Sequence, residues 1–96
     1  MTVLDCKTLE EEVQSGAILL DVRSEQEWQQ ARLPGATLIP VNRLAEVQNK
    51  IAPGSKILAY CRSGQRSEWA ANQLKAWGYD AMNIGGVMHY MQCIEY

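Results

Sequence analysis

The chain has 96 residues and a formal net charge of −2, which gives no electrostatic reason to bind nucleic acid or an acidic membrane surface. Its hydrophobic fraction of 47% and charged fraction of 21% are those of a globular protein, and the length suits a single domain, residues 1–96. No stretch approaches the roughly 20 apolar residues of a membrane span. The first residues lack the basic start and apolar core of a secretory signal, so we expect a cytoplasmic protein.

The first part of the chain predicts helices and strands in alternation. Residues 2–4 are compatible with a short strand, and Thr8-x-x-Glu11 is a capping-box pattern that predicts a short helix. The continuous apolar residues at 17–22 predict a buried strand. A second capping box, Ser24-x-x-Glu27, opens the next helical unit, which ends by Pro34-Gly35.

The alternation continues to the end of the chain. Residues 37–39 predict a short strand, and Asn42 predicts the N-cap of a helix that ends before Pro53. Residues 56–60 predict a buried strand, and apolar side chains at helical spacing follow at 70–77, with Gly78 as the stop. Residues 81–84 predict the last strand. This order is typical of an α/β domain with a mostly parallel sheet.

Cys61 is the candidate nucleophile. It ends the strand 56–60 and begins a loop that leads into the next helix, where free N–H groups and the helix dipole favour an anion. Arg62 and Arg66 add positive charge, and such surroundings favour a thiolate over a thiol. A cysteine that only closes the core would need neither these arginines nor Gly64, which permits a backbone turn with inward N–H groups.

The other two cysteines, Cys6 and Cys93, lie near the chain ends. Three cysteines are too few for a disulfide scaffold, and they share no metal-ligand spacing with His89, so we expect no metal and no cofactor. We interpret Cys6 and Cys93 as packing residues. The alternative is that one of them resolves an oxidised Cys61.

Side chains near the loop have competing interpretations. Arg66 either contacts the substrate or holds the loop by bonding carbonyls or a carboxylate such as Asp21 or Glu27, and we favour the latter. Ser67 is expected to cap the helix, although its hydroxyl is close enough in sequence to reach Cys61. We expect Asp21 and Arg23 to form a polar network. Arg32 is expected either at the surface or as an anion contact. Trp28, Trp69 and Trp77 are expected to be packing residues, with Trp69 able to flank the pocket.

The motifs together resemble the rhodanese-like sulfurtransferases. The loop Cys61–Ser67 is similar to the family's active-site loop, Asp21-Val22-Arg23 to its Asp-Val-Arg strand end, and Leu33–Ala36 and Asn83–Gly86 to its other signatures, all in the family's order. The chain departs from the pattern at Ala31-Arg32, where the family commonly has Gly-His, and at Tyr90, where it usually has tryptophan.

The resemblance implies a five-stranded, mostly parallel sheet with helices on both faces. It also implies transfer of a sulfane sulfur from thiosulfate, or another persulfide donor, to cyanide or a thiol through a persulfide on Cys61. The substrate-binding residues implied at this loop are Arg62, Ser63, Gly64, Gln65, Arg66 and Ser67. The partners would be this small-molecule donor and thiophilic acceptor, or a protein that carries a persulfide.

Two other functions remain as alternatives. A cysteine phosphatase uses a similar anion loop, but its spacing is Cys-x5-Arg, whereas Cys61 to Arg66 is Cys-x4-Arg and therefore one residue shorter. A persulfide relay with a protein partner would use the same chemistry with another donor and acceptor. The chain contains Cys61, which disfavours an inactive binding module.

Overall fold

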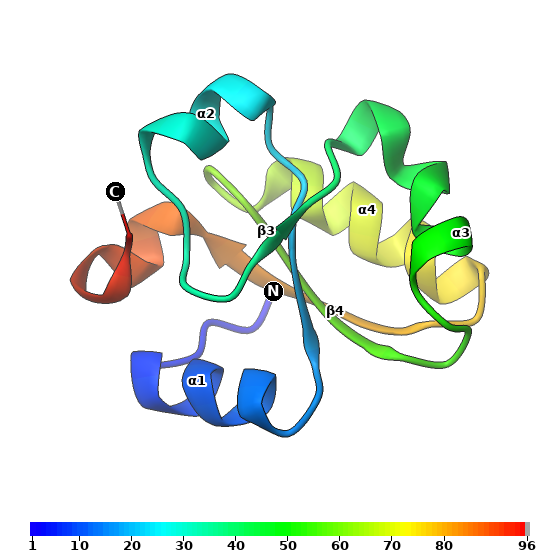
Figure 1. The fold of residues 1–96 in the computed structure, drawn as a ribbon, viewed down its shortest axis with the longest axis horizontal. Helices are drawn as coiled ribbons and strands as arrows, with labels where there is room; N and C mark the ends of the chain where they lie inside the picture. The colour runs from blue at the N-terminus through cyan, green and yellow to red at the C-terminus, as the bar shows by residue number, and fades with distance from the viewer. Residues whose placement is uncertain (96) are drawn as a thin grey trace.

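The structure is a computed structural model that describes residues 1–95. It is an α/β fold in which helices cover both faces of a parallel sheet, as the sequence predicts (Figure 1). The sheet order is β2-β1-β3-β4. The strands span Ile18–Asp21 (β1), Thr37–Leu38 (β2), Lys56–Cys61 (β3) and Asp80–Gly86 (β4).

The prediction of five strands was wrong, because the described residues form a four-stranded sheet. Residues 2–4 were the candidate fifth strand. The Thr2 N–H does donate to the carbonyl of Asn83 in β4, at 2.9 Å. Two residues later the Leu4 N–H donates instead to the Tyr90 hydroxyl, at 3.0 Å. One backbone hydrogen bond does not make a ladder, so the segment only touches the edge of the sheet.

The helices are α1 (Cys6–Gln14), α2 (Glu25–Gln30), α3 (Val47–Lys50) and α4 (Gln65–Ala76), with 3₁₀ helices η1 (Val41–Glu46) and η2 (Val87–Cys93). The capping box of α2 is confirmed. The expected caps at Thr8 and Asn42 were wrong. Asp5, not Thr8, caps α1, by accepting the Thr8 N–H at 2.7 Å. Asn42 lies inside η1, which starts after Pro40.

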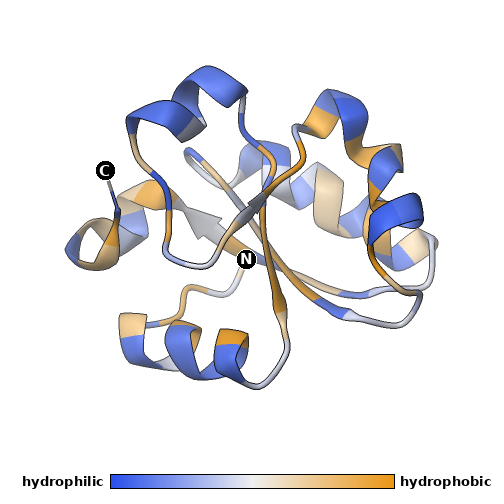
Figure 2. Cartoon of the chain, in the orientation of Figure 1, coloured by the Kyte–Doolittle hydropathy of each residue, from blue (hydrophilic) through white to orange (hydrophobic). Residues whose placement is uncertain are grey.

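Two apolar cores lie on opposite faces of the sheet. Helix α4 and the η1–α3 segment cover one face, where Leu44, Val47 and Leu74 pack against β1 and β3. Helix α1 and η2 cover the other, where Leu9 and Tyr90 pack against the sheet. Helices α1 and α2 consist mostly of hydrophilic residues, whereas the central strands contain long apolar stretches (Figure 2). No helix within residues 1–95 has both the length and the apolar character needed to cross a membrane.

The topology brings the candidate site residues to one end of the sheet. Because the strands are parallel, their carboxyl ends all lie at the same end of the sheet, which is where ligands bind in open α/β folds. Asp21 ends β1, Cys61 ends β3 and Gly86 ends β4. Helix α2 follows β1 at the same end (Figure 1). The fold therefore places the expected site residues together.

Candidate active site at the Cys61 loop

The backbone after Cys61 turns sharply into α4. Cys61 pairs with Gly86 across a register shift between β3 and β4, and residues 62–64 connect it to the helix. Gly64 is the N-cap, with φ of 102°, a conformation that L side chains rarely adopt. The expectation that Ser67 caps the helix was wrong, because Ser67 is the third residue of α4.

Hydrogen-bond donors converge on the Cys61 sulfur. The N–H of Gly64 donates to Sγ at 3.0 Å, and the N–H and hydroxyl of Ser67 lie at 3.4 and 3.3 Å. Burial raises the pKa of the Cys61 thiol, but these donors and the Ser63 N–H outweigh burial and leave the pKa below its ordinary value. The loop therefore stabilises negative charge on the sulfur.

Asn83 is a site residue that the sequence interpretation missed. Its side-chain oxygen accepts the Ser67 hydroxyl at 2.7 Å and the Gly85 N–H at 3.0 Å. Its amide nitrogen donates to the Gly64 carbonyl at 3.0 Å. Asn83 thus fixes both the loop and the hydroxyl that faces Cys61. The signal available in the sequence was its position beside the Gly85-Gly86 pair, which did not indicate a role for its side chain.

The double glycine permits a close approach of β4 to the loop. A Cβ on Gly86 would overlap the carbonyl oxygen of Arg62 and lie 2.7 Å from the Ser63 Cα. Real Cβ atoms essentially never come that close to backbone. Only glycine at this position lets the end of β4 pack directly beneath the loop that follows Cys61.

Arg66 holds the loop against α2. Its guanidinium donates to both carboxylate oxygens of Glu27, at 2.7 and 3.0 Å. The predicted contact between Arg66 and a carboxylate is therefore present, with Glu27 as the carboxylate. The Arg66 hydrogen bonds lower the pKa of Glu27 to about 2, against an opposing effect of burial.

Arg62 lies beside the loop with its side chain exposed to solvent. Among residues 1–95 it forms no salt bridge within 4.0 Å. It borders a hollow of about 340 Å³, together with Arg23, Glu27 and Val87. Ser63 and Gln65 are also exposed, and with Gly64 they border a second hollow. Cys61, by contrast, is only 1% exposed.

The expected polar network at the end of β1 is confirmed. Asp21 is fully buried, accepts the Arg23 guanidinium at 2.8 Å, and accepts the Tyr60 hydroxyl at 2.7 Å. Arg23 also donates to the Ala31 carbonyl. The network therefore fixes the segment that leads into α2.

Arg32 and Trp69 differ from their expected roles, and Tyr90, for which no role was predicted, lies in a core. Arg32 is half-buried, with its guanidinium 4.8 Å from the ring centroid of Trp28, so it is not a plain surface charge. Trp69 is 56% exposed, so its packing role was wrong, and it borders a hollow together with Gln65 and Arg66. Tyr90 is buried, and its hydroxyl donates to the Ile84 carbonyl at 2.6 Å.

The interpretation of Cys6 and Cys93 as unpaired packing residues was wrong. They form a disulfide between α1 and η2, whereas Cys61 is free. The two cysteines are 87 residues apart in sequence, and their proximity arises because α1 and η2 cover the same face of the sheet. Neither is therefore available to resolve an oxidised Cys61 while the disulfide is intact.

Comparison with known proteins agrees with this geometry. The family model of the rhodanese-like domain matches residues 5–92. A putative sulfur carrier protein, YrkF of Bacillus subtilis, is 36% identical over 64% of this chain and 33% of its own length. Thiosulfate sulfurtransferase 18 of Arabidopsis thaliana is 33% identical over 88% of this chain and 71% of its own length.

A solved structure agrees as well. The crystal structure of reduced Bacillus anthracis CoADR-RHD superimposes with a TM-score of 0.86 at 27% identity, covering 100% of this chain and 18% of that one. The chain thus spans a third of YrkF and less than a fifth of the Bacillus anthracis chain. The family match covers nearly the whole sequence and includes every element of the Cys61 loop. This chain belongs to the rhodanese-like domain family.

Proposed function

We propose that this protein is a thiosulfate sulfurtransferase, which moves a sulfane sulfur from thiosulfate or another persulfide donor to cyanide or a thiol through Cys61. The observation that carries the proposal is the convergence of Gly64 and Ser67 donors on the Cys61 sulfur, which lowers its pKa. A thiolate is the reactive form in such a displacement.

The first step is a displacement at sulfur. The Cys61 thiolate attacks the outer sulfur of thiosulfate, the S–S bond of thiosulfate breaks, and sulfite leaves with the electron pair. The product is a persulfide anion on Cys61. In the second step cyanide attacks the terminal sulfur, which yields thiocyanate and regenerates the Cys61 thiolate. No oxidant, metal or proton donor is needed in either step.

The loop supplies the binding groups for this chemistry. The N–H groups of Ser63, Gly64, Gln65, Arg66 and Ser67 lie at the start of α4, where a negative sulfur is stabilised by donors and by the helix dipole. Arg62 is the residue we assign to the sulfonate oxygens of the donor, since its guanidinium is exposed and makes no ion pair among residues 1–95. Arg66 acts through its bond to Glu27, which holds the loop.

A persulfide relay with a protein partner is the second candidate. It is favoured by the name of the relative YrkF, a putative sulfur carrier protein, and by apolar side chains exposed near the loop. Trp69 is 56% exposed and lies beside Gln65 and Arg66. Met1 is 67% exposed and borders the hollow at Ser63 and Gly64. The chemistry at Cys61 would be the same, with a protein persulfide in place of thiosulfate.

Mass spectrometry of the intact protein tests the proposal. Incubation with thiosulfate should add one sulfur, about 32 Da, and cyanide should remove it. Cys61→Ser should abolish the addition, whereas Ser63→Ala, a matched control on the exposed side of the loop, should retain it. Arg62→Ala should raise KM for thiosulfate and leave loading by a neutral organic persulfide donor unchanged. Loading of the Cys61→Ser variant would overturn the proposal, and hydrolysis of an aryl phosphate without sulfur loading would favour a phosphatase instead.

A further inference from the structure

The Cys6–Cys93 disulfide connects helix α1 near the N-terminus to helix η2 near the C-terminus. Cys6 is the first residue of α1 and Cys93 the last of η2, with 6.0 Å between their Cα atoms. Both side chains are only partly buried. The bond therefore joins the N-terminal and C-terminal segments at a point that solvent reaches.

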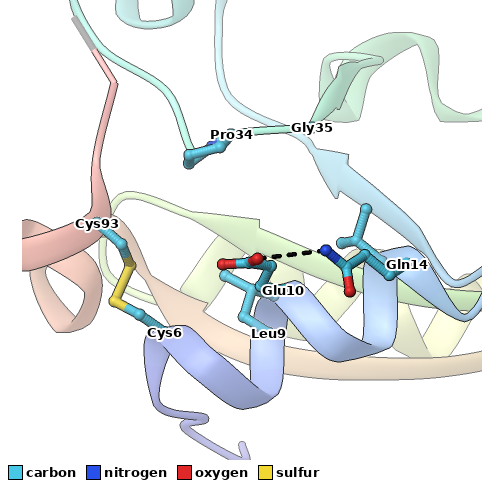
Figure 3. Close-up of a pocket in the computed structure, with 8 residues that line it drawn as sticks. Cys6, Leu9, Glu10, Gln14, Pro34, Gly35 and Cys93 are labelled. Atoms are coloured by element: carbon cyan, nitrogen blue, oxygen red, sulfur yellow. Dashed lines mark hydrogen bonds between the residues drawn. A yellow bond between two sulfur atoms is a disulfide. The ribbon is translucent and has the colours of Figure 1, made fainter.

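A cavity lies beside this disulfide (Figure 3). It has a volume of about 280 Å³ and is lined by Leu9, Val13, Pro34 and Gly35, together with the two cysteines. The hydrogen-bonded pair of Glu10 and Gln14 also lines it. In Figure 3 the cavity lies between α1 and the loop that carries Pro34, and the disulfide lies at one end of it. A small thiol can thus approach the sulfur atoms from the cavity.

The segment before Cys6 reaches the Cys61 loop. The Met1 thioether lies so close to Gly64 and Gly85 that a Cβ on either would be 2.8 or 3.3 Å from its sulfur. The Thr2 N–H donates to the Asn83 carbonyl at 2.9 Å, in the residue whose side chain also orients Ser67. Met1 and Thr2 therefore lie beside Gly64 of the loop and the end of β4.

The segment on the other side of the disulfide reaches the same loop. Helix η2 starts directly after Gly86, which packs beneath the Arg62 carbonyl. The Tyr90 hydroxyl of η2 accepts the Leu4 N–H at 3.0 Å, and so joins the two segments a second time. The disulfide consequently restrains both segments that border a nucleophile only 1% exposed.

We propose that the Cys6–Cys93 disulfide is a second thiol-reactive site, and that its opening by a small-molecule thiol loosens residues 1–5, which the Thr2 and Leu4 hydrogen bonds alone then hold, and increases the reactivity of Cys61. A thiolate attacks Sγ of Cys6 or Cys93 and forms a mixed disulfide, while the other cysteine leaves as a thiolate. A second thiol molecule resolves the mixed disulfide, giving two cysteine thiols and the oxidised small molecule. The inference rests on the proposed function only in taking Cys61 as the reacting cysteine.

The test measures alkylation of Cys61 by iodoacetamide, which does not depend on sulfur transfer. In the oxidised protein Cys61 should be the one cysteine labelled. After treatment with reduced glutathione all three cysteines should be labelled. Cys61 should then react about fivefold faster, the factor that corresponds to the loss of one net hydrogen bond, here the bond from Thr2 to Asn83. The Cys6→Ser/Cys93→Ser variant should react at the fast rate without glutathione.

Thr2→Pro keeps the proposal testable if the double serine variant fails to fold. Proline removes the N–H that Thr2 donates to Asn83, with the disulfide left intact. This variant should react at the fast rate while oxidised, whereas Thr2→Ala, which keeps the N–H, should react at the slow rate. Equal rates in the oxidised, reduced and Thr2→Pro proteins, or a disulfide that glutathione leaves closed, would overturn the proposal. Thiol-dependent alkylation without persulfide formation would instead overturn only the proposed sulfurtransferase function.

Discussion

The Ser67 hydroxyl should set the acidity of Cys61. It has one proton and three acceptors, namely the Asn83 oxygen at 2.7 Å, the Cys61 sulfur at 3.3 Å and the Gly85 carbonyl at 3.4 Å. When Cys61 is a neutral thiol, the shorter bond to Asn83 is preferred. Ionisation of Cys61 turns the hydroxyl toward the sulfur, because a hydrogen bond to a charged acceptor is worth more, about 1.5–3 kcal/mol.

Ser67→Ala removes this donor and leaves the Gly64 and Ser67 N–H groups in place. Since the bond to sulfur is long and shared, we take the lower value, about 1.5 kcal/mol. Because this energy is lost from the thiolate and not from the neutral thiol, the pKa of Cys61 should rise. Stability should fall by only about 1 kcal/mol, because the Asn83 oxygen still accepts the Gly85 N–H.

The assay is the rate of Cys61 alkylation as a function of pH, with the Cys6–Cys93 disulfide kept intact so that Cys61 is the free thiol. The inflection of the curve gives the pKa. Ser63→Ala is the matched control, since its side chain is exposed and the Ser63 N–H is retained. An unchanged inflection in a folded Ser67→Ala protein would refute the argument and leave the backbone donors as the source of the lowered pKa.

Three further changes test the surroundings of the loop. Glu27→Gln should lower the free energy of unfolding at pH 7 by about 1 kcal/mol, allowing for solvent at this partly exposed pair. The pKa of Glu27 is about 2 in the folded protein, below its usual 4.5, so its contribution to stability is present above pH 4.5 and is lost as pH falls toward 2. The urea midpoints of the two proteins should therefore converge near pH 2, and a difference that stays constant with pH would contradict this. Tyr90→Phe should cost about 1–2 kcal/mol in urea unfolding, because the Leu4 N–H and Ile84 carbonyl lose their partner, and a wild-type midpoint would show that water replaces the hydroxyl. Gly86→Ala should lower the free energy of unfolding by about 1–3 kcal/mol and slow Cys61 alkylation, because the new Cβ displaces the Arg62 carbonyl. Wild-type stability and alkylation rate would mean that the loop moves aside without affecting Cys61.

Sequence patterns predicted the parts of this fold that depend on neighbours in the chain. The capping box of α2 and the buried strand that ends at Cys61 are local features, and both are present. The cap of α1 shows where local patterns become ambiguous. Asp5 and Thr8 are both good capping residues, and Asp5 is used because its side chain accepts the Thr8 N–H and α1 starts at Cys6.

The features that were missed depend on contacts between distant segments. Cys6 and Cys93 are 87 residues apart, and nothing near either residue indicates that they pair. Asn83 acts on Ser67 and Gly64 from the neighbouring strand, so its role depends on the order of β3 and β4 in the sheet. Arg66 is the exception, because the tight loop itself required an acidic or carbonyl partner, and Glu27 was among the few candidates.

Tyr90 shows how a visible departure from the family pattern alters the structure elsewhere. A tryptophan, usual at this position, carries an N–H that can only donate, and so cannot accept the Leu4 N–H. The tyrosine hydroxyl both accepts from Leu4 and donates to the Ile84 carbonyl, a pair of bonds that joins residues 1–5 to the end of β4. In taking the Leu4 N–H, it removes a backbone donor from the edge of β4. The Leu4 N–H is therefore satisfied by a side chain of η2, where a fifth strand would have bonded it to the backbone of β4.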